Sequence, residues 1–332
     1  MNKTDPISVV ILAFDGALAS AITGAADLFS LSGVSWQRFH KQAIQPSFHV
    51  QICSSNGQDV QCINQIKLSE NRDINTIEKC DLLLIPTIGA DIDKTIKQNL
   101  NLLPHITRLR NQGAEIASNC SGAFFLAETG LLDNKEATTH WGYTDVFQTR
   151  YPKVKLQTNK MITQSEGVFC AGGGMAWYDL ALLLIERYVS RQMAQETAKS
   201  HLIDMQRGNQ SVYANLRQLR QHKDEIILSA QQYIETHYHE AISVLNVATH
   251  FHLSTRTLIR RFKKNVGITP IEYIQRVRLE QAKRILESER INVSVVAQKV
   301  GYEDISSFSR IFKRSTGLSP AQYKLKFAKP LS

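Results

Sequence analysis

The sequence predicts two domains of different class: an α/β sandwich on a mostly parallel sheet, followed by an all-α domain. Apolar strand-like runs alternate with helical or loop stretches over the first 190 residues, and a 22-residue segment near the C-terminus is repeated. The length of 332 residues agrees with this division, since one domain usually holds roughly 100–200 residues.

The composition is typical of a globular chain, with 43% hydrophobic and 21% charged residues. No apolar run approaches the ~18 residues of a membrane span, and residues 1–16 make a poor signal peptide, so we expect a cytoplasmic protein without a membrane partner. The five cysteines are scattered and form no CxxC pair, so we expect no disulfide framework, no metal site and no cofactor. They are Cys53, Cys62, Cys80, Cys120 and Cys170.

The positive charge is concentrated in the last third of the chain. The net charge is +9, and residues 225–332 hold 17 Lys and Arg against 9 Asp and Glu. A basic terminal domain on a near-neutral body favours a polyanion partner, most simply nucleic acid. A solvated basic surface is the alternative that charge alone leaves open.

The repeat defines the architecture of the C-terminal third. Residues 254–275 align without a gap with residues 304–325, including a shared Phe262/Phe312 and Gly267/Gly317. Ser254 and Asp304 are typical N-caps, and each glycine fits the position that ends a helix. Capping boxes at 269–272 and 319–322, each with proline at the first helical position, start a further helix.

A short alanine-containing helix is expected before each copy, at 244–251 and 293–300. A short helix, a turn and a basic helix form the helix-turn-helix pattern, so we predict two such units at about 244–265 and 293–316. Residues 271–288 have a continuous apolar face and are expected to form a long helix that joins the units.

In each unit the second helix is expected to enter the major groove of DNA with its outward side chains. Arginine can bind guanine edges in bidentate fashion, serine can bind a base or a phosphate, and residues near the helix ends, such as Lys263 and Lys313, suit phosphates. An intradomain salt bridge of the repeated Arg260 and Arg310 is the alternative. The predicted DNA-binding residues are Arg256, Ile259, Arg260, Lys263, Ile305, Ser306, Ser309, Arg310 and Lys313.

This third of the chain resembles the AraC/XylS family of bacterial transcription regulators over about residues 227–326. The resemblance rests on residues 278–288 and 291–323, with mild departures at Tyr302, where Phe is usual, and at Ile305. It implies that the two units of one protomer bind two successive major grooves on one face of DNA, roughly 34 Å apart.

The N-terminal part contains candidate strands at 9–14, 48–53, 82–85, 116–119 and 168–171, and we expect a β-hairpin at 155–164. Because sites in such sheets form where strands end and helices begin, Cys120 is the central candidate. The N-terminus of the following helix is expected to lower the pKa of its thiol. Asp27, expected at the start of the first helix, and His140 could complete a nucleophilic site.

Each candidate also has an ordinary structural explanation. Cys120 could be a small buried hydrophobe, and the ring of His140 could simply bond the backbone. Asp27 could interact with the helix dipole. The glycines at 172–174 could hold a phosphate or carboxylate, or only permit close packing.

Residues 113–141, and more loosely 168–186, resemble the ThiJ/PfpI superfamily with its class I glutamine amidotransferase-like fold. The similarity spans about residues 7–190 and implies a flavodoxin-like α/β sandwich with Cys120 at a nucleophile elbow and Asp27 near it. Peptidase members carry His directly after the cysteine, whereas Ser121 stands here, so the resemblance favours the hydratase-like and regulatory branches.

The expected order is therefore a ligand-sensing domain at 7–190, a linker at 191–224 and a DNA-binding domain at 225–326. Together they predict a homodimeric transcription regulator, not an enzyme, which binds promoter DNA, works with RNA polymerase and responds to a small molecule. The resemblance points to an amino acid or a quaternary amine as that effector. A Cys-dependent hydrolase, hydratase or glyoxalase, and a redox sensor acting through Cys120, are the competing classes. The predicted ligand-binding residues are Asp27, Cys120, Ser121, His140 and Gly173.

Overall fold

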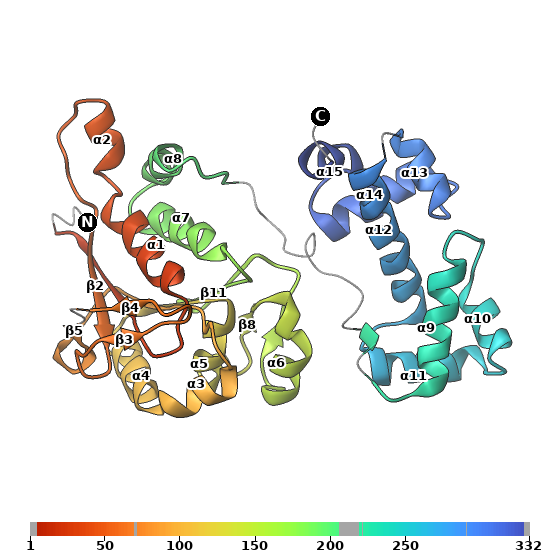
Figure 1. Ribbon diagram of the computed structural model, residues 1–332, viewed down its shortest axis with the longest axis horizontal. Helices are drawn as coiled ribbons and strands as arrows, with labels where there is room; N and C mark the ends of the chain where they lie inside the picture. The colour runs from red at the N-terminus through yellow and green to blue at the C-terminus, as the bar shows by residue number, and fades with distance from the viewer. Residues whose placement is uncertain (1–4, 70–71, 206–218, 221, 290, 329–332) are drawn as a thin grey trace. The chain divides into compact units, whose positions relative to one another are not determined.

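The computed structural model describes residues 5–69, 72–205, 219–220, 222–289 and 291–328. Its contacts divide the chain into two units, one up to residue 211 and one from residue 212. Figure 1 draws the first unit in red to green and the second in cyan to blue. The division agrees with the predicted change of class, since the first unit is α/β and the second is wholly helical in its described part.

A seven-stranded sheet forms the centre of the first unit, in the order β10-β11-β7-β6-β1-β2-β5. All neighbouring strands are parallel except β10 and β11, which are antiparallel. The mostly parallel sheet of the prediction is thereby confirmed. The strands are β1 (Ile7–Leu12), β2 (Phe48–Ser54), β5 (Arg72–Asp73), β6 (Leu82–Ile85), β7 (Glu115–Asn119), β10 (Ile162–Ser165) and β11 (Val168–Ala171).

Helices cover both faces of this sheet, as Figure 1 shows. One face carries α1 (Ala19–Ser30), α2 (Ser35–Phe39), α7 (Ala176–Tyr188) and α8 (Arg191–Ser200), and the other carries α3 (Ile92–Gln98), α4 (Leu103–Asn111) and α5 (Ala123–Glu128). Helix α6 (Thr144–Arg150) packs against α5 through Phe147 and Phe124, whose ring centroids are 4.9 Å apart. Two small sheets pair β3 (Val60–Gln61) with β4 (Lys67–Leu68) and β8 (Glu136–Ala137) with β9 (Lys155–Leu156).

The segment expected to link the domains, 191–224, begins as part of the first unit. Ala194 and Ala198 of α8 are buried in the N-terminal core, and α8 packs on α7 and α2. Residues 206–218 and 221 of this segment lie outside the described residues.

The expected hairpin at 155–164 is wrong. Strand β9 pairs in parallel with β8, and the antiparallel hairpin joins β10 and β11 instead. Its two turn residues, Glu166 and Gly167, have φ values of +48° and +74°, which matches the twist that a two-residue hairpin turn requires. The sequence Ser-Glu-Gly at 165–167 was therefore the turn signal, and the Thr-Asn-Lys at 158–160 was not.

Seven described helices form the second unit, and they make two separate hydrophobic cores. Helix α12 contributes to both: Tyr273, Ile274 and Val277 pack in the first core, and Leu279, Ala282 and Leu286 in the second. The predicted long joining helix is thus confirmed. The helices are α9 (Glu225–His237), α10 (Val244–His250), α11 (Thr255–Val266), α12 (Pro270–Ser288), α13 (Val293–Lys299), α14 (Ile305–Thr316) and α15 (Pro320–Phe327).

The internal repeat holds in the structure at the level of single positions. Residues 258–270 and 308–320 have the same succession of buried, half-buried and exposed side chains. Ser254 and Asp304 cap α11 and α14 as predicted, and Gly267 and Gly317 end these helices with φ of +77° and +78°. Both predicted capping boxes are present as well. One sequence pattern therefore builds the same local structure twice.

Asp224 ties α9 to α11. Its carboxylate caps α9 by accepting from Ile227 N at 3.2 Å, and it accepts from Arg261 Nη2 at 2.5 Å and Nε at 3.0 Å. Asn265 Nδ2 donates to the same carboxylate at 2.8 Å. The hydrogen bond from Arg261 is the main reason why the pKa of Asp224 lies below its usual value.

We predict that Asp224→Asn destabilises the second unit by roughly 1–3 kcal/mol, because a charge-assisted pair is lost and Arg261 faces an amide. Since the folded pKa is lowered, this stabilisation is present above the unfolded pKa of about 3.9 and is lost as the pH falls through the folded value. Hydrogen exchange of the α9 and α11 amides in the full chain, measured from neutral to acid pH, checks both statements. Asp304→Asn is the control, since Asp304 caps α14 without an ion pair in the described residues. If Asp224→Asn and Asp304→Asn changed the exchange of the α9 and α11 amides equally, the stabilising role of the Asp224–Arg261 pair would be contradicted.

Candidate functional site: the cysteine elbow and the two recognition helices

Cys120 lies on a tight turn between β7 and α5, as the resemblance implied. Its φ is +55°, a left-handed conformation that side chains other than glycine rarely adopt. Gly122 makes the turn possible, because a Cβ at that position would lie 2.5 Å from the carbonyl oxygen of Pro86 and 2.7 Å from that of Ile85. The strand, the strained turn and the helix are the structural context of a nucleophile elbow.

Hydrogen-bonding groups surround the sulfur of Cys120. The backbone amides of Gly174 and Ser121 and the hydroxyl of Thr87 approach it. Asn119 Nδ2 donates to Thr87 Oγ1 at 2.7 Å, which leaves the hydroxyl proton of Thr87 to point toward the sulfur. The cysteine therefore lies in a polar cradle rather than in an apolar core.

Burial nevertheless raises the pKa of the Cys120 thiol, because only 5% of the residue is exposed and desolvation of a thiolate outweighs these donors. The expectation of a lowered pKa is therefore wrong in its net direction, although the Ser121 amide at the start of the helix does lower the pKa. The hydroxyl of Ser121 donates to the carbonyl oxygen of Ile88 at 2.8 Å. The neutral thiol is the ordinary state of Cys120.

His140 and Gly173 pack against each other beside the elbow. A Cβ at Gly173 would lie 1.8 Å from Cδ2 of His140, so glycine is required there for the ring to fit. Thr139 Oγ1 donates to the carbonyl oxygen of Cys120 at 2.8 Å and fixes the neighbouring chain. The structure thus brings Cys120, Ser121, His140 and Gly173 into one region.

The His140 ring is oriented by the backbone. Its Nδ1 accepts from Gly142 N at 2.9 Å, which assigns the proton of the neutral ring to Nε2. Burial lowers the pKa of His140, so the ring is neutral near pH 7. Tyr143 stands beside it, with ring centroids 5.8 Å apart. Burial raises the pKa of Tyr143, and nearby Cys120 contributes to this shift.

Asp27 does not lie where it was expected. Helix α1 begins at Ala19, so Asp27 is in its last turn rather than at its start, and its side chain is exposed. At 1.5 Å per residue, Asp27 is about 12 Å along the helix from Ala19. Asp27 is not among the groups that act on the pKa of Cys120.

Three residues at the site were missed in the sequence: Thr87, Asn119 and Tyr143. Thr87 follows the apolar strand at 82–85 and Asn119 ends β7, so the rule that sites form at strand ends could have found both. Tyr143 carries no such signal, because its proximity to the sulfur depends on the fold.

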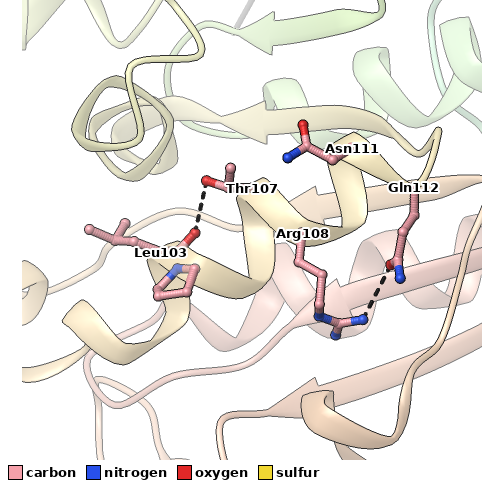
Figure 2. Close-up of a pocket in the computed structure, with 6 residues that line it drawn as sticks. Leu103, Thr107, Arg108, Asn111 and Gln112 are labelled. Carbon is pink, nitrogen blue, oxygen red and sulfur yellow. Dashed lines mark hydrogen bonds between the residues drawn. The ribbon is translucent and has the colours of Figure 1, made fainter.

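The structure also has a hollow along α4, lined by Leu103, Pro104, Thr107, Arg108, Asn111 and Gln112 (Figure 2). The guanidinium of Arg108 is already bound to the carbonyl oxygens of Ile77 at 2.8 Å and Ile74 at 3.0 Å. None of the lining residues is a predicted site residue. Among the residues that the structure describes, no group of three or more His, Cys, Asp or Glu could hold a metal ion. No described helix is long and apolar enough to cross a membrane.

The second helix of each helix-turn-helix unit presents its predicted DNA-binding residues outward. Helix α11 exposes Arg256, Arg260 and Lys263, and α14 exposes Ile305, Ser306, Arg310 and Lys313, with Ile259 and Ser309 half-buried. Leu258, Phe262, Phe308 and Phe312 point inward and are fully buried. Within the described part of the chain Arg260 and Arg310 make no ion pair, so the salt-bridge alternative has no observed partner there.

Since the thiol of Cys120 is buried, we predict that it reacts slowly and only at high pH. Alkylation by iodoacetamide, followed for the Cys120 peptide by mass spectrometry, is expected to rise with a midpoint above that of free cysteine, about 8.5. The same peptide after unfolding in urea is the control. A pH midpoint below that of the unfolded peptide would mean that the hydrogen-bond donors around the Cys120 sulfur stabilise a thiolate.

Comparison with known proteins gives the same two parts. The DJ-1/PfpI family matches residues 8–186, and a helix-turn-helix domain matches residues 247–326. The HTH-type transcriptional regulator CdhR of Pseudomonas aeruginosa is 25% identical over 287 residues, which cover 86% of this chain and 83% of CdhR. The HTH-type transcriptional regulator GlxA of Rhizobium meliloti is 25% identical over 226 residues, 66% of this chain and 68% of GlxA.

Solved structures resemble the first unit in fold. A ThiJ/PfpI family protein from Pseudomonas syringae has a TM-score of 0.51 at 18% identity and covers 61% of this chain and 79% of its own. Drosophila melanogaster DJ-1beta has a TM-score of 0.50 at 17% identity and covers 60% of this chain and 100% of its own. The chain therefore belongs to the DJ-1/PfpI family and joins that domain to a C-terminal AraC-type helix-turn-helix domain, as its transcription-regulator relatives do.

Proposed function

We propose that this chain is a transcription regulator that binds promoter DNA through α11 and α14 and is controlled by a small molecule bound beside Cys120. The observation that carries the DNA part is the pair of matching helices, each with an exposed arginine at the same repeat position, Arg260 and Arg310. Neither guanidinium has a described ion-pair partner, so both are available to a polyanion.

The predicted contacts divide into two kinds. Arg256, at the second position of α11, suits a base edge in the major groove, because N-terminal residues of a recognition helix approach the bases. Ile259 and Ile305 offer apolar contact to a thymine methyl, and Ser306 and Ser309 can bond a base or a phosphate. Lys263 and Lys313 lie in the last turns and suit phosphates.

The cysteine region supports binding better than catalysis. A nucleophilic thiol needs a base within hydrogen-bond reach, and His140 already uses Nδ1 for a backbone amide. The pKa of Cys120 is raised by burial, and Asp27 lies in a different turn from the one expected. Thr87, Tyr143 and the rings of His140 and Trp141 instead provide polar and aromatic groups of the kind that hold a small molecule.

Helix α7 offers a route from this site toward the second unit. The Gly174 amide contacts the Cys120 sulfur just before α7 begins, and the far end of α7 packs on α8. At that end Arg187 and Tyr188 bond the carboxylate of Glu115 on β7 at 2.5 to 2.9 Å. A ligand that favours one position of α7 would therefore bias the segment that continues toward the DNA-binding unit.

The remaining parts of the proposal follow from the family resemblance. We propose that the protein acts as a homodimer in the cytoplasm, where it meets promoter DNA and RNA polymerase. An amino acid or quaternary amine is the proposed effector class. Hydratase, hydrolase and redox-sensing activities of Cys120 are the alternatives, and Cys120→Ser distinguishes them from binding alone.

Arg256→Ala is expected to lower specific affinity by roughly 1–3 kcal/mol and to relax preference at one base pair, because a bidentate contact to a base edge is lost. Selection from a random DNA library with the full chain, followed by binding titrations, measures both effects. Lys264→Ala is the control: it should weaken binding evenly across sequences and reduce the salt dependence by about one phosphate contact. An unchanged base preference in Arg256→Ala would contradict the assignment of this residue.

Cys120→Ser tests the role of the thiol. We expect a reporter under the control of this regulator to keep its response to the effector, because serine keeps the small polar shape and only thiol chemistry is lost. Gly173→Ala is the positive control, since its Cβ would displace His140 and should abolish the response. Loss of the response in Cys120→Ser alone, or turnover of a hydratable substrate by the wild type that Cys120→Ser abolishes, would contradict the proposal of binding without catalysis.

A further inference from the structure

Helix α12 passes from one core of the second unit to the other within two residues. The side chain of Val277 packs in the first core and that of Leu279 in the second. Arg278 lies between them, so its side chain leaves the helix at the boundary of the two helix-turn-helix units.

On one side, the guanidinium of Arg278 binds the end of α9, in the first helix-turn-helix unit. Its Nε donates to the carbonyl oxygen of Tyr238 at 2.8 Å, and its Nη2 donates to that of Glu240 at 2.8 Å. Tyr238 is the C-cap of α9. The last carbonyl groups of a helix lack intrahelical donors and carry partial negative charge, so a cation is well suited to this position.

On the other side, the same guanidinium contacts the turn between α13 and α14, in the second helix-turn-helix unit. Its Cζ lies 5.3 Å from the centre of the Tyr302 ring, within cation–π range. Gly301 has a φ of +83°, and a Cβ there would lie 2.8 Å from the Tyr238 oxygen and 2.9 Å from Nη2 of Arg278. Both helix-turn-helix units therefore pack closely around this guanidinium, and a methyl group added at Gly301 would not fit beside it.

Other side chains at this junction agree with a shared role. The Tyr238 side chain packs against both cores. The hydroxyl of Tyr302 is buried without a hydrogen-bond partner among the described residues, so the contribution of Tyr302 comes from its ring. Two bodies joined along a single helix can rock about that helix, and a second attachment beside the helix axis restrains this motion.

We propose that Arg278 is a positioning residue that fixes the spacing and rotation between the two recognition helices. This inference rests on the proposed binding of DNA by both α11 and α14. One base pair inserted between two contacted grooves moves the second by about 3.4 Å and roughly 34°. A rigid contact between the helix-turn-helix units makes that displacement cost binding free energy. A variant with a weakened contact can follow the displacement at a lower cost.

The test uses the full chain and a DNA site selected from a random library with the wild type. Each recognition helix is expected to contact one short stretch of base pairs, here called a box. Affinity is measured for the selected site and for versions with one base pair inserted or deleted between its two boxes. It is also measured for DNA that keeps only one box. Arg278→Ala is expected to bind the selected site about tenfold more weakly and to lose much less further affinity on insertion than the wild type does. Its affinity for one-box DNA should match that of the wild type, because each recognition helix is intact.

Arg284→Ala is the matched control, an exposed arginine on the same helix, and it should keep the wild-type spacing dependence. Arg278→Lys should restore part of the spacing penalty, since an ammonium can bind one of the two carbonyl oxygens. Gly301→Ala changes the junction from the other side and should relax the spacing dependence as well, and it decides the matter if circular dichroism shows that Arg278→Ala does not fold.

The inference is overturned if the folded Arg278→Ala protein keeps the full wild-type penalty for insertion. It is also overturned if one-box and two-box affinities fall by the same factor, since that outcome means general destabilisation of the units. If the wild type itself selects no two-box site, the proposed function fails as well, and this outcome is visible before any variant is made.

Discussion

The burial of opposite ends of α12 in two separate cores is the constraint on which the DNA-binding unit depends. Neither core is large, and each is completed by a half of the same helix. At 1.5 Å per residue, the 19 residues of α12 span about 28 Å, which is close to the length of one turn of DNA. The repeat of the sequence thus becomes two copies of one structure joined by α12, and the proposed role of Arg278 is to fix their spacing and rotation.

In the first unit, the backbone around Cys120 has the form of a nucleophile elbow. The side chains around it are arranged in a way that suits binding better than catalysis. A cysteine in left-handed conformation stores strain, and the structure keeps it through Gly122 and the close approach of β6. The sulfur is nevertheless surrounded by protein, its pKa is raised by burial, and the neighbouring His140 ring is neutral. The elbow thus combines the backbone of a nucleophile site with a neutral thiol and a neutral imidazole.

Much of the fold could be predicted because its signals are local. The capping residues Ser254 and Asp304, the terminating glycines and the apolar stripes all act within one or two helical turns. The sequence alone therefore identified α10 to α15, whereas α9 was not singled out. The inner strands β1, β6, β7 and β11 are mostly buried, and they and β2 were visible as strand-like runs. The edge strands β5 and β10 carry no long apolar run, and β5 was not predicted while β10 was placed in the wrong hairpin.

The errors concern features without a local signal. Helix α1 begins after Leu18, which provides no side-chain cap, so its start was misplaced and Asp27 with it. The pKa of Cys120 is raised by burial, and hydrogen bonds from Gly174, Ser121 and Thr87 lower it to a smaller extent. Thr87 and Gly174 lie far from Cys120 in the sequence and meet it only in the fold. The helix N-terminus was the only effect visible in the sequence, and desolvation proved the larger one.

The central claim is that one protomer contacts DNA through two equivalent helices held at a fixed distance. Hydroxyl-radical footprinting of the full chain on a selected site tests it most directly. The account predicts two protected stretches on the same face of the duplex, with centres about 10 base pairs apart, and loss of only one of them in DNA that carries a single box. A single protected stretch on the intact site, or protection spread without register, would contradict it.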